Sequence, residues 1–264
     1  MHRLPARAKR RHLGYVPGRR ELPLERAEEI ARAREEVHRK PPQRRRRRAP
    51  KTWDWRDIGG HSFVTPPKDQ DSCLACTAFA VVATLETAMK VHHEMPYLDP
   101  DYSEGHLFNC LAPFWIGCGT GWSVEPALAA LVKTGVVDEA CYPWVPGGAR
   151  CWERCEDWKK RVTKIAGSVH LTEPEDMKVW LATRGALVAT MTSYEDLYSY
   201  AGGIYEHIEG AKMGGHAVSC VGYNDVERYW ICKNSWGAWG EGGFFRIRYG
   251  QCGIGAEMWG VNVE

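Results

Sequence analysis

The sequence predicts an α+β protein of two lobes, because two kinds of pattern occupy different halves of the chain. Between residues 77 and 133, apolar residues recur at helical spacing and are bounded by capping and stop signals. After residue 186, apolar or alternating runs are separated by turn residues such as Asn224-Asp225, which is typical of strands. Helices in one half and strands in the other predict two packed lobes, and a cleft between them can use residues from both.

The individual elements follow from caps, breakers and periodicity. The expected helices are 77–92, 103–110 with Ser103 as N-cap, 123–133 ended by Gly135, and 173–184 capped by Thr172 and ended by Gly185. The expected strands are 186–192, 216–223, 228–233 and 243–249. The globular part is expected to begin near Trp53, and we divide the chain into a leader, 1–48, and a main domain, 49–264.

The leader differs from the main domain in charge. Residues 1–50 hold 17 Lys and Arg against 6 Asp and Glu, whereas the remainder holds 18 against 27. A basic segment ahead of an acidic body indicates a leader that docks on the body or is removed from it, or else a solvated basic tail. Leu22–His38 has strong helix formers but a narrow apolar stripe, so its helix needs a docking partner.

The arginine run Arg44–Arg48 lies between prolines, which predicts an extended linker. Nuclear localisation and nucleic-acid contact are the competing interpretations, but no aromatic residue lies among the arginines. The chain has no apolar run of membrane-spanning length, and its N-terminus lacks the apolar core of a signal peptide. We expect no membrane partner and no nucleic acid.

Ten cysteines are many for a cytosolic protein of this length, and seven fall between residues 73 and 155 in loop-like sequence. This density indicates a disulfide framework with at least one thiol left over. Zinc is the alternative, since Cys73-x-x-Cys76 and Cys151-x3-Cys155 have ligand-like spacing, but the Cys-x-x-Cys motif does not repeat and no histidine pair lies at the matching spacing. We therefore expect no metal and no cofactor. Disulfides favour an oxidising compartment, although the location itself is not fixed by the sequence.

The stretch QDSCLACTAFA, residues 70–80, carries the main catalytic candidate. Cys76 lies at or just before the first turn of an apolar helix. Unpaired backbone N–H groups and the positive end of the helix dipole favour the thiolate, which is the nucleophilic form of cysteine. A thiolate needs a base to hold its proton, and the base needs a residue that orients it.

His216 is the candidate base, because among the ten histidines it alone opens an apolar strand, GHAVSCVGY. The next expected strand ends in KNSWG, which supplies Asn234 and Trp236. An amide fixes the tautomer of an imidazole, and a neighbouring indole shields their hydrogen bond from water. Each feature is weak alone, but together they indicate nucleophilic acyl transfer.

These stretches resemble the papain family of cysteine peptidases across residues 53–264. The motifs that carry the resemblance occur in the family's order: WDWR, QDSCLACTAFA, DYSEGHLFNC, GCGTG, HAVSCVGY, KNSWGAWGEGGFFRI and CGIGAE. The resemblance implies a papain-like two-lobe fold, with a helical left lobe, a β-barrel-like right lobe and the active-site cleft between them. It also implies these catalytic groups: Cys76 as nucleophile, His216 as proton partner, Asn234 as orienting residue, and Gln70 with the Cys76 N–H as oxyanion donors.

The resemblance extends to the disulfides and to the substrate cleft. It implies the pairs Cys73–Cys118 and Cys110–Cys151, and we hypothesise a further pair, Cys141–Cys155. Cys252 matches half of a family disulfide whose other half is absent, and Cys220 and Cys232 are interpreted as buried thiols within strands. The substrate-binding residues implied are Gly121, Trp122, Ser123, Trp236 and Glu257, with Ala189 or Thr190 as a further wall.

Four side chains near this cleft depart from the family's pattern. Asp71 and Leu74 stand where the family has glycine, Thr77 replaces a tryptophan, and Thr120 interrupts the glycine loop. The segment NSWGAWG is also one residue shorter than usual. These changes alter the lining of the cleft and leave the catalytic groups in place.

Glu257 lies where the family has the floor of the S2 pocket, which holds the second residue upstream of the cut. A carboxylate there resembles cathepsin B and predicts tolerance of Arg or apolar side chains. Because no histidine-bearing insertion lies between Gly121 and Cys151, an endopeptidase is expected. We expect a monomeric zymogen, inhibited by its own pro-region and cleaved near Arg48-Ala49, that acts on proteins or peptides.

Three alternatives stay open from the sequence. One is a papain-like binding protein with impaired catalysis, a second is another Cys-His-Asn acyltransferase or amidase, and a third is a protein that binds partners through its basic arm.

Overall fold

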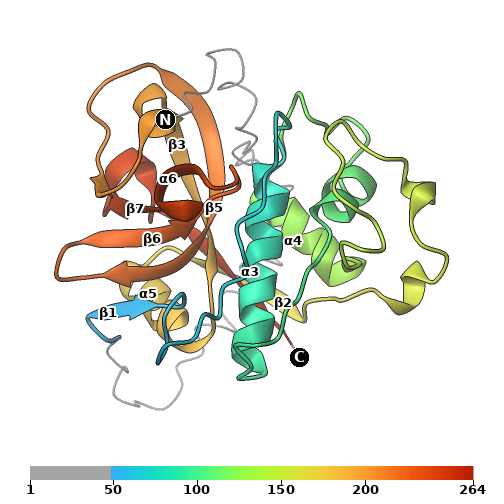
Figure 1. Ribbon diagram of the computed structural model, residues 1–264, viewed down its shortest axis with the longest axis horizontal. Helices are drawn as coiled ribbons and strands as arrows, with labels where there is room; N and C mark the ends of the chain where they lie inside the picture. The colour runs from blue at the N-terminus through green and yellow to red at the C-terminus, as the bar shows by residue number, and fades with distance from the viewer. Residues whose placement is uncertain (1–48, 264) are drawn as a thin grey trace, which may run out of the picture.

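Two lobes lie on either side of one long helix in the computed structural model, which describes residues 49–263 (Figure 1). The helix is α3, Cys76–His92, and it stands between the strands and the remaining helices. The leader helix expected at Leu22–His38 and the arginine-rich linker lie outside the described residues.

The helical lobe follows α3 in the chain. Its elements are a π-helical turn η1 at His106–Leu111, α4 at Val124–Lys133, and short 3₁₀ turns η2 at Cys151–Glu153 and η3 at Trp158–Lys160. The remaining short helices accompany the strands and are α5 at Pro174–Thr183, η4 at Glu195–Ser199, α6 at Trp239–Gly242 and η5 at Gln251–Gly253. Three disulfides join the loops of the helical lobe: Cys73–Cys118, Cys110–Cys151 and Cys141–Cys155.

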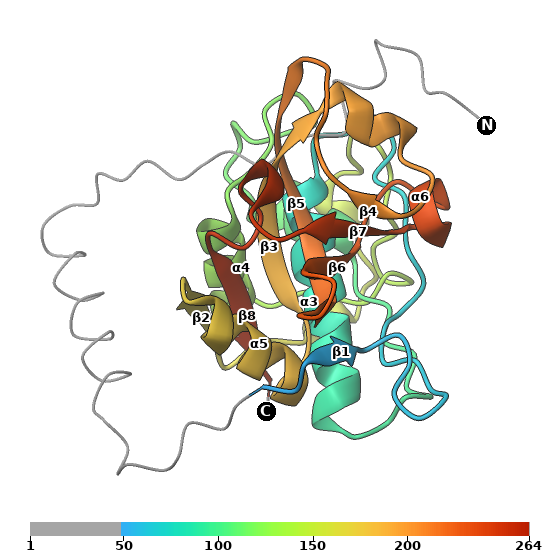
Figure 2. The same ribbon diagram turned by 90° about the vertical axis from the view of Figure 1, so that its left-hand side faces the viewer.

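The strands form a single mixed sheet, seen from its outer side in Figure 2. The strands are β1 Thr52–Asp54, β2 Gly167–Leu171, β3 Leu187–Tyr194, β4 Ile204–Tyr205, β5 Lys212–Asn224, β6 Tyr229–Lys233, β7 Phe244–Arg248 and β8 Met258–Asn262. Their order is β2-β8-β3-β5-β6-β7-β4, with β1 added to β5, and only β4 and β7 pair in parallel. The path does not return to its start, so the lobe that was expected to be barrel-like is a curved open sheet.

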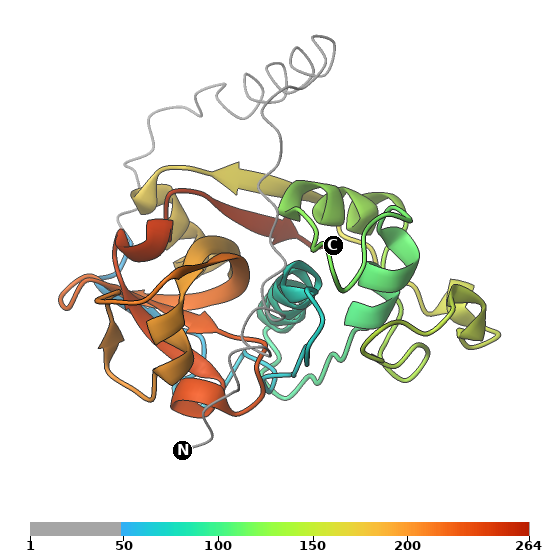
Figure 3. The ribbon, with the colours of Figure 1, turned by 90° about the horizontal axis from the view of Figure 1, so that it is seen from above.

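The two faces of this sheet belong to different cores. Val188 and Ala217 on one face, with Trp259 and Val261 of β8, pack with α3 and α4. The opposite face packs with α5 and with the aromatic residues of β6 and β7. Figure 3 shows β2 and β8 running from the other strands towards α4, so this strand pair ties the two lobes together.

The expected elements occur with shifted ends, and the sequence analysis missed four strands. Ser103 caps its helix as expected, because its hydroxyl accepts a hydrogen bond from His106 N at 2.8 Å. Thr172 does not cap α5; the N-cap is Glu173, and Pro174 occupies the first helical position, where its missing N–H costs nothing. The missed strands are the short edge strands β1, β2, β4 and the terminal strand β8.

Gly222 allows β1 to approach β5, and this contact provides a test of the fold. A Cβ at Gly222 would lie 2.3 Å from Trp53 O and 3.0 Å from Asp54 Cα, both of which are backbone atoms. We expect Gly222→Ala to lower the free energy of unfolding by about 2 kcal/mol, as overpacking does. Denaturant unfolding in a Cys76→Ala background, which prevents autolysis, measures this change.

Gly167→Ala in β2 is the matched control, because nothing lies within 4 Å of its added Cβ. That variant should be neutral or slightly stabilising. Equal stability of the two variants would contradict the close approach of β1.

Candidate active site

Cys76 is the first residue of α3, and its position is fixed by the loop before it. The Cys73–Cys118 disulfide ties this loop to the helical lobe, and Leu74 N donates to Cys118 O at 3.1 Å. Ala75 is the N-cap, and its carbonyl accepts the first helical hydrogen bonds. The buried Cys76 thiol therefore lies at the N-terminus of a 17-residue helix, where the helix dipole favours its thiolate.

Gln70 joins this loop to the end of β6. Its side-chain amide donates to Cys73 O at 2.7 Å, and its side-chain oxygen accepts from the Ser235 hydroxyl at 2.6 Å. Its backbone N–H also donates to Ser235 O at 2.9 Å. Ser235 follows Asn234 directly, so the same short segment positions Gln70 and the candidate orienting amide. The sequence analysis did not identify Ser235.

His216 lies on β5 and is hydrogen-bonded to Asn234, which directly follows β6. The distance from His216 Nε2 to Asn234 Oδ1 is 2.8 Å, and both side chains are buried. A carbonyl oxygen only accepts, so Nε2 carries the proton of this bond. The antiparallel pairing of β5 with β6 brings the two residues together although they are 18 positions apart.

A stack of aromatic rings covers the His216–Asn234 pair. Trp236 lies on the imidazole with ring centroids 4.9 Å apart, and Tyr198 is also stacked on Trp236 at 4.9 Å. Burial raises the pKa of Tyr198, Ser193 opposes this shift, and the nearby Cys76 adds to it. Tyr198 therefore belongs to the aromatic cover of the site, and sequence reasoning missed it.

Thr77 replaces the tryptophan that the papain resemblance predicts, and the structure gives it a contact. Its hydroxyl is buried and donates to Trp122 O at 2.7 Å. Gly121, which precedes Trp122, has a positive φ of 70°. Ser123 is the N-cap of α4. The hydrogen bond of Thr77 therefore fastens the start of α3 to the segment expected to bind substrate.

The residues expected to form the S2 pocket share one face of the sheet. Thr190 of β3 lies opposite Ala217 of β5, and the β3–β8 pairing places Val188 opposite Trp259. Glu257 directly precedes β8 and contacts His170 at 3.1 Å, and His170 lies opposite Trp259 on β2, so Glu257 is at the same face as Trp259. Ala189 lies opposite Met258 and is fully buried in the core behind the sheet. Of the two residues proposed as a wall, Thr190 is therefore the one on this face.

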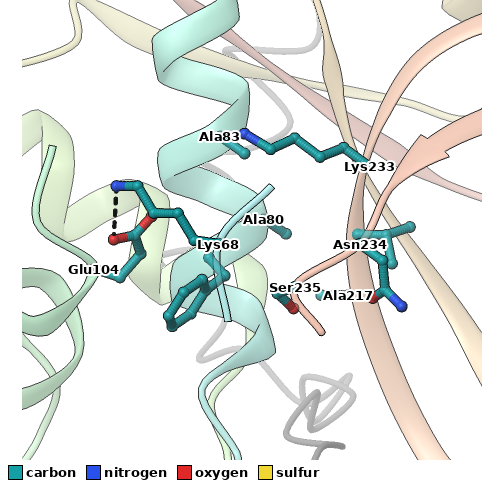
Figure 4. A pocket seen from close by; sticks show the side chains of 10 residues that line it. Lys68, Ala80, Ala83, Glu104, Ala217, Lys233, Asn234 and Ser235 are labelled. Carbon is teal, nitrogen blue, oxygen red and sulfur yellow. Dashed lines mark hydrogen bonds and ion pairs between the residues drawn. The ribbon is translucent and has the colours of Figure 1, made fainter. Parts of the chain in front are cut away.

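A buried ionic cluster lies beside α3 beneath the site, with Lys68 and Glu104 on one side of the helix in Figure 4 and Lys233 on the side of the sheet. Lys68 donates to Glu104 at 3.0 Å and to Glu86 of α3 at 3.3 Å. Lys233, which precedes Asn234, lies 3.8 Å from Glu86 and donates to Thr65 at 2.8 Å. Sequence analysis missed this cluster, because its members lie far apart in the chain and each resembles an ordinary surface charge.

Burial dominates the titration of this cluster. It raises the pKa of Glu104 to about 8, against the pull of Lys68 and with the help of Glu86. Burial also lowers the pKa of Lys233. For Lys68, burial acts in the lowering direction, but Glu104 and Glu86 outweigh it and raise the pKa. The cluster thus holds two buried acidic side chains, Glu86 and Glu104, with two lysines at the lobe interface, and burial favours the protonated form of Glu104.

Within the described residues there is no group of three or more His, Cys, Asp or Glu side chains placed to hold a metal ion. In the same part of the chain, none of the helices has the length and apolar character needed to span a membrane.

The fold, with a cysteine at the start of the helix between two lobes, is that of the papain-like cysteine peptidases. The chain belongs to this family, because residues 49–261 match the family model described as papain family cysteine protease. It is accordingly a hydrolase of the thiol protease class.

Relatives and solved structures agree with this assignment. Cathepsin B-like CP3 of Giardia intestinalis is 35% identical over 227 residues, which cover 80% of this chain and 74% of the relative. Mexicain of Jacaratia mexicana is 34% identical over 78% of this chain and 94% of the relative. The digestive procathepsin L2 proteinase of Tenebrio molitor superimposes with a TM-score of 0.74 and 28% identity, covering 98% and 81% of the two chains.

The titration of Glu104 predicts how stability varies with pH. Its pKa is about 8 in the folded state and near 4.5 as a free side chain, so between these pH values the folded state binds one more proton than the unfolded state. The contribution of Glu104 to the free energy of unfolding therefore falls as pH rises from 5 to 8. Relative to Glu104→Gln, the wild type should lose about 2–3 kcal/mol over this range.

Denaturant unfolding at several pH values, again with Cys76→Ala, measures this difference. Glu125→Gln is the control, because Glu125 is exposed on α4. A difference between wild type and Glu104→Gln that stays constant with pH would contradict the protonation of buried Glu104.

Proposed function

We propose that this peptidase cleaves internal peptide bonds through a thiolate at Cys76, with His216 as its proton partner and Asn234 as the orienting residue. The hydrogen bond between His216 Nε2 and Asn234 Oδ1, at 2.8 Å beneath Trp236, is the observation that carries the proposal. This bond occupies Nε2 and leaves Nδ1 as the nitrogen that exchanges a proton with the thiol.

The reaction begins with the thiolate–imidazolium pair. Cys76 Sγ attacks the carbonyl carbon of the scissile bond, and His216 then donates its proton to the leaving amine. Water attacks the resulting thioester, with His216 now accepting a proton, and the acid product leaves as Cys76 is restored. The α3 dipole stabilises the Cys76 thiolate before it attacks and again as it leaves the thioester.

The oxyanion of each tetrahedral intermediate needs donors. Gln70 supports this role, because its amide has two N–H groups and one already holds Cys73 O at 2.7 Å. That bond and the Ser235 contact fix the direction of the second N–H. The backbone N–H of Cys76, in the first turn of α3, is the partner donor.

Glu257 is proposed as the floor of the S2 pocket, with Trp122 and Ser123 on the opposite wall. The shared face of Thr190, Ala217 and Glu257 supports this assignment. A carboxylate there attracts Arg at the second position upstream of the cut.

Residues 1–48 are proposed to be an inhibitory pro-region. The family match begins at Ala49, and the digestive procathepsin L2 of Tenebrio molitor is a precursor by its name. Near this boundary, Tyr223 donates to Pro50 O at 2.7 Å and Asp225 N donates to Lys51 O at 2.8 Å. These contacts attach the first residues of the main domain to the end of β5.

Fluorogenic Phe-Arg and Arg-Arg peptides test the proposed activity. Wild-type protein should cleave them and lose activity to an epoxide thiol inhibitor, and Cys76→Ala should have none. Asn234→Ala should lower kcat/KM by about 10- to 100-fold, since a misdirected imidazole costs that much. Asn262→Ala, at the end of β8, is the control and should keep normal activity.

Other outcomes of this assay separate the remaining functions. A folded protein without peptidase activity, or full activity in Cys76→Ala, would overturn the mechanism. Transfer of the acyl group to an added amine in preference to water would indicate an acyltransferase.

Processing of the leader is a separate prediction. On acidification, wild-type protein should gain a new N-terminus at Ala49, because a pocket with Glu257 accepts Arg47 when the cut follows Arg48. Cys76→Ala should stay intact and be cleaved only when active enzyme or a trypsin-like protease is added. N-terminal sequencing reads both results, and an intact Arg48–Ala49 bond in both proteins would refute self-processing.

A further inference from the structure

His170 on β2 contacts the residue proposed to set the specificity of this peptidase. Its Nε2 lies 3.1 Å from Glu257 Oε2. An ionised carboxylate only accepts hydrogen bonds, so His170 donates. The two side chains are 29% and 38% exposed, which is the partial exposure of groups at the rim of a pocket. The alternating pattern of GSVHL was the signal that could have placed His170 on a strand.

The position of His170 is fixed by the sheet. It lies directly opposite Trp259 in the β2–β8 pairing, and its ring is stacked on the indole with centroids 4.9 Å apart and planes 14° apart. Trp259 and Glu257 are two residues apart, so all three side chains lie on the face that also carries Thr190. The stack holds the imidazole where it meets the carboxylate.

This contact matters when an apolar side chain enters the pocket. Such a side chain displaces water from Glu257, and a carboxylate that loses water without a replacement donor is costly to bury. His170 supplies that donor from the side of the pocket wall. An Arg in the same pocket brings its own donors and does not depend on His170.

We propose that His170 is a positioning residue that keeps the S2 pocket tolerant of apolar side chains by holding and partly neutralising Glu257. The inference rests on the proposed S2 role of Glu257. In this arrangement His170 lowers the cost of binding Phe, while binding of Arg depends mainly on the carboxylate itself. The pocket accepts both classes because β2 contributes the imidazole donor that contacts Glu257.

Two variants separate the hydrogen bond from the aromatic stack. His170→Phe keeps a ring on Trp259 but removes the donor, and His170→Gln keeps an N–H donor without the ring. The readout is the ratio of kcat/KM for Arg-Arg over Phe-Arg peptides in the processed enzyme. His170→Phe should raise this ratio about three- to tenfold, mainly through a lower value for Phe-Arg. His170→Gln should keep a ratio near that of the wild type.

A merely structural role for His170 would change both substrates by the same factor and leave the ratio alone. An unchanged ratio in His170→Phe would overturn the inference, and His170→Ala gives the same test if the Phe variant does not fold. His61→Phe, on an exposed loop, is the matched control and should match the wild type.

Glu257→Gln distinguishes failure of the inference from failure of the proposed pocket. If Glu257→Gln lowers the Arg preference while the His170 variants do not alter it, Glu257 lines the pocket and the role of His170 is wrong. If Glu257→Gln leaves the ratio unchanged, the assignment of the pocket fails and the inference fails with it. If the wild-type protein cleaves neither peptide, the catalytic proposal itself is refuted.

Discussion

The buried carboxylate of Glu86 is the constraint on which the rest of the site depends. It lies on α3 and is fully buried. It accepts hydrogen bonds from Thr65, Lys68 and Tyr102 N, and Lys233 lies 3.8 Å away. Leaving such a charge without partners costs several kcal/mol, so these segments must come together around α3 as the chain folds.

The partners of Glu86 are close to the catalytic candidates in sequence. Lys68 is two residues before Gln70, and Lys233 is the residue before Asn234. The hydrogen bonds of Glu86 therefore set the distance between the first residues of α3 and the end of β6. A small shift of either segment would misplace the thiol, the imidazole or the oxyanion donors, so the charge cluster supports the site without taking part in the chemistry.

The sequence was sufficient for the class of fold and for the family, since both follow from local motifs, and it singled out His216 and Asn234, whose side chains the structure brings to 2.8 Å. It could not locate β2, an edge strand, or β8, which lies between β2 and β3, because both strands are short and their pairing is non-local. The sequence analysis therefore did not place His170 on a strand, and the contact of His170 with Glu257, 87 residues away, had no local signature. Thr77 was unexplained from sequence, because its hydrogen-bond partner, the carbonyl of Trp122, is 45 residues distant.

The distribution of the disulfides places opposite redox demands on one small region. As the proposed nucleophile, Cys76 has to remain a thiol, yet Cys73, three residues earlier, is bonded to Cys118, and all three disulfides of the described residues lie in the helical lobe. A reductant strong enough to rescue an oxidised nucleophile therefore also attacks the bridge that presents it. The protein can therefore work only at intermediate reduction potentials. More oxidising conditions would oxidise the Cys76 thiol, and more reducing conditions would break the Cys73–Cys118 disulfide that holds its loop.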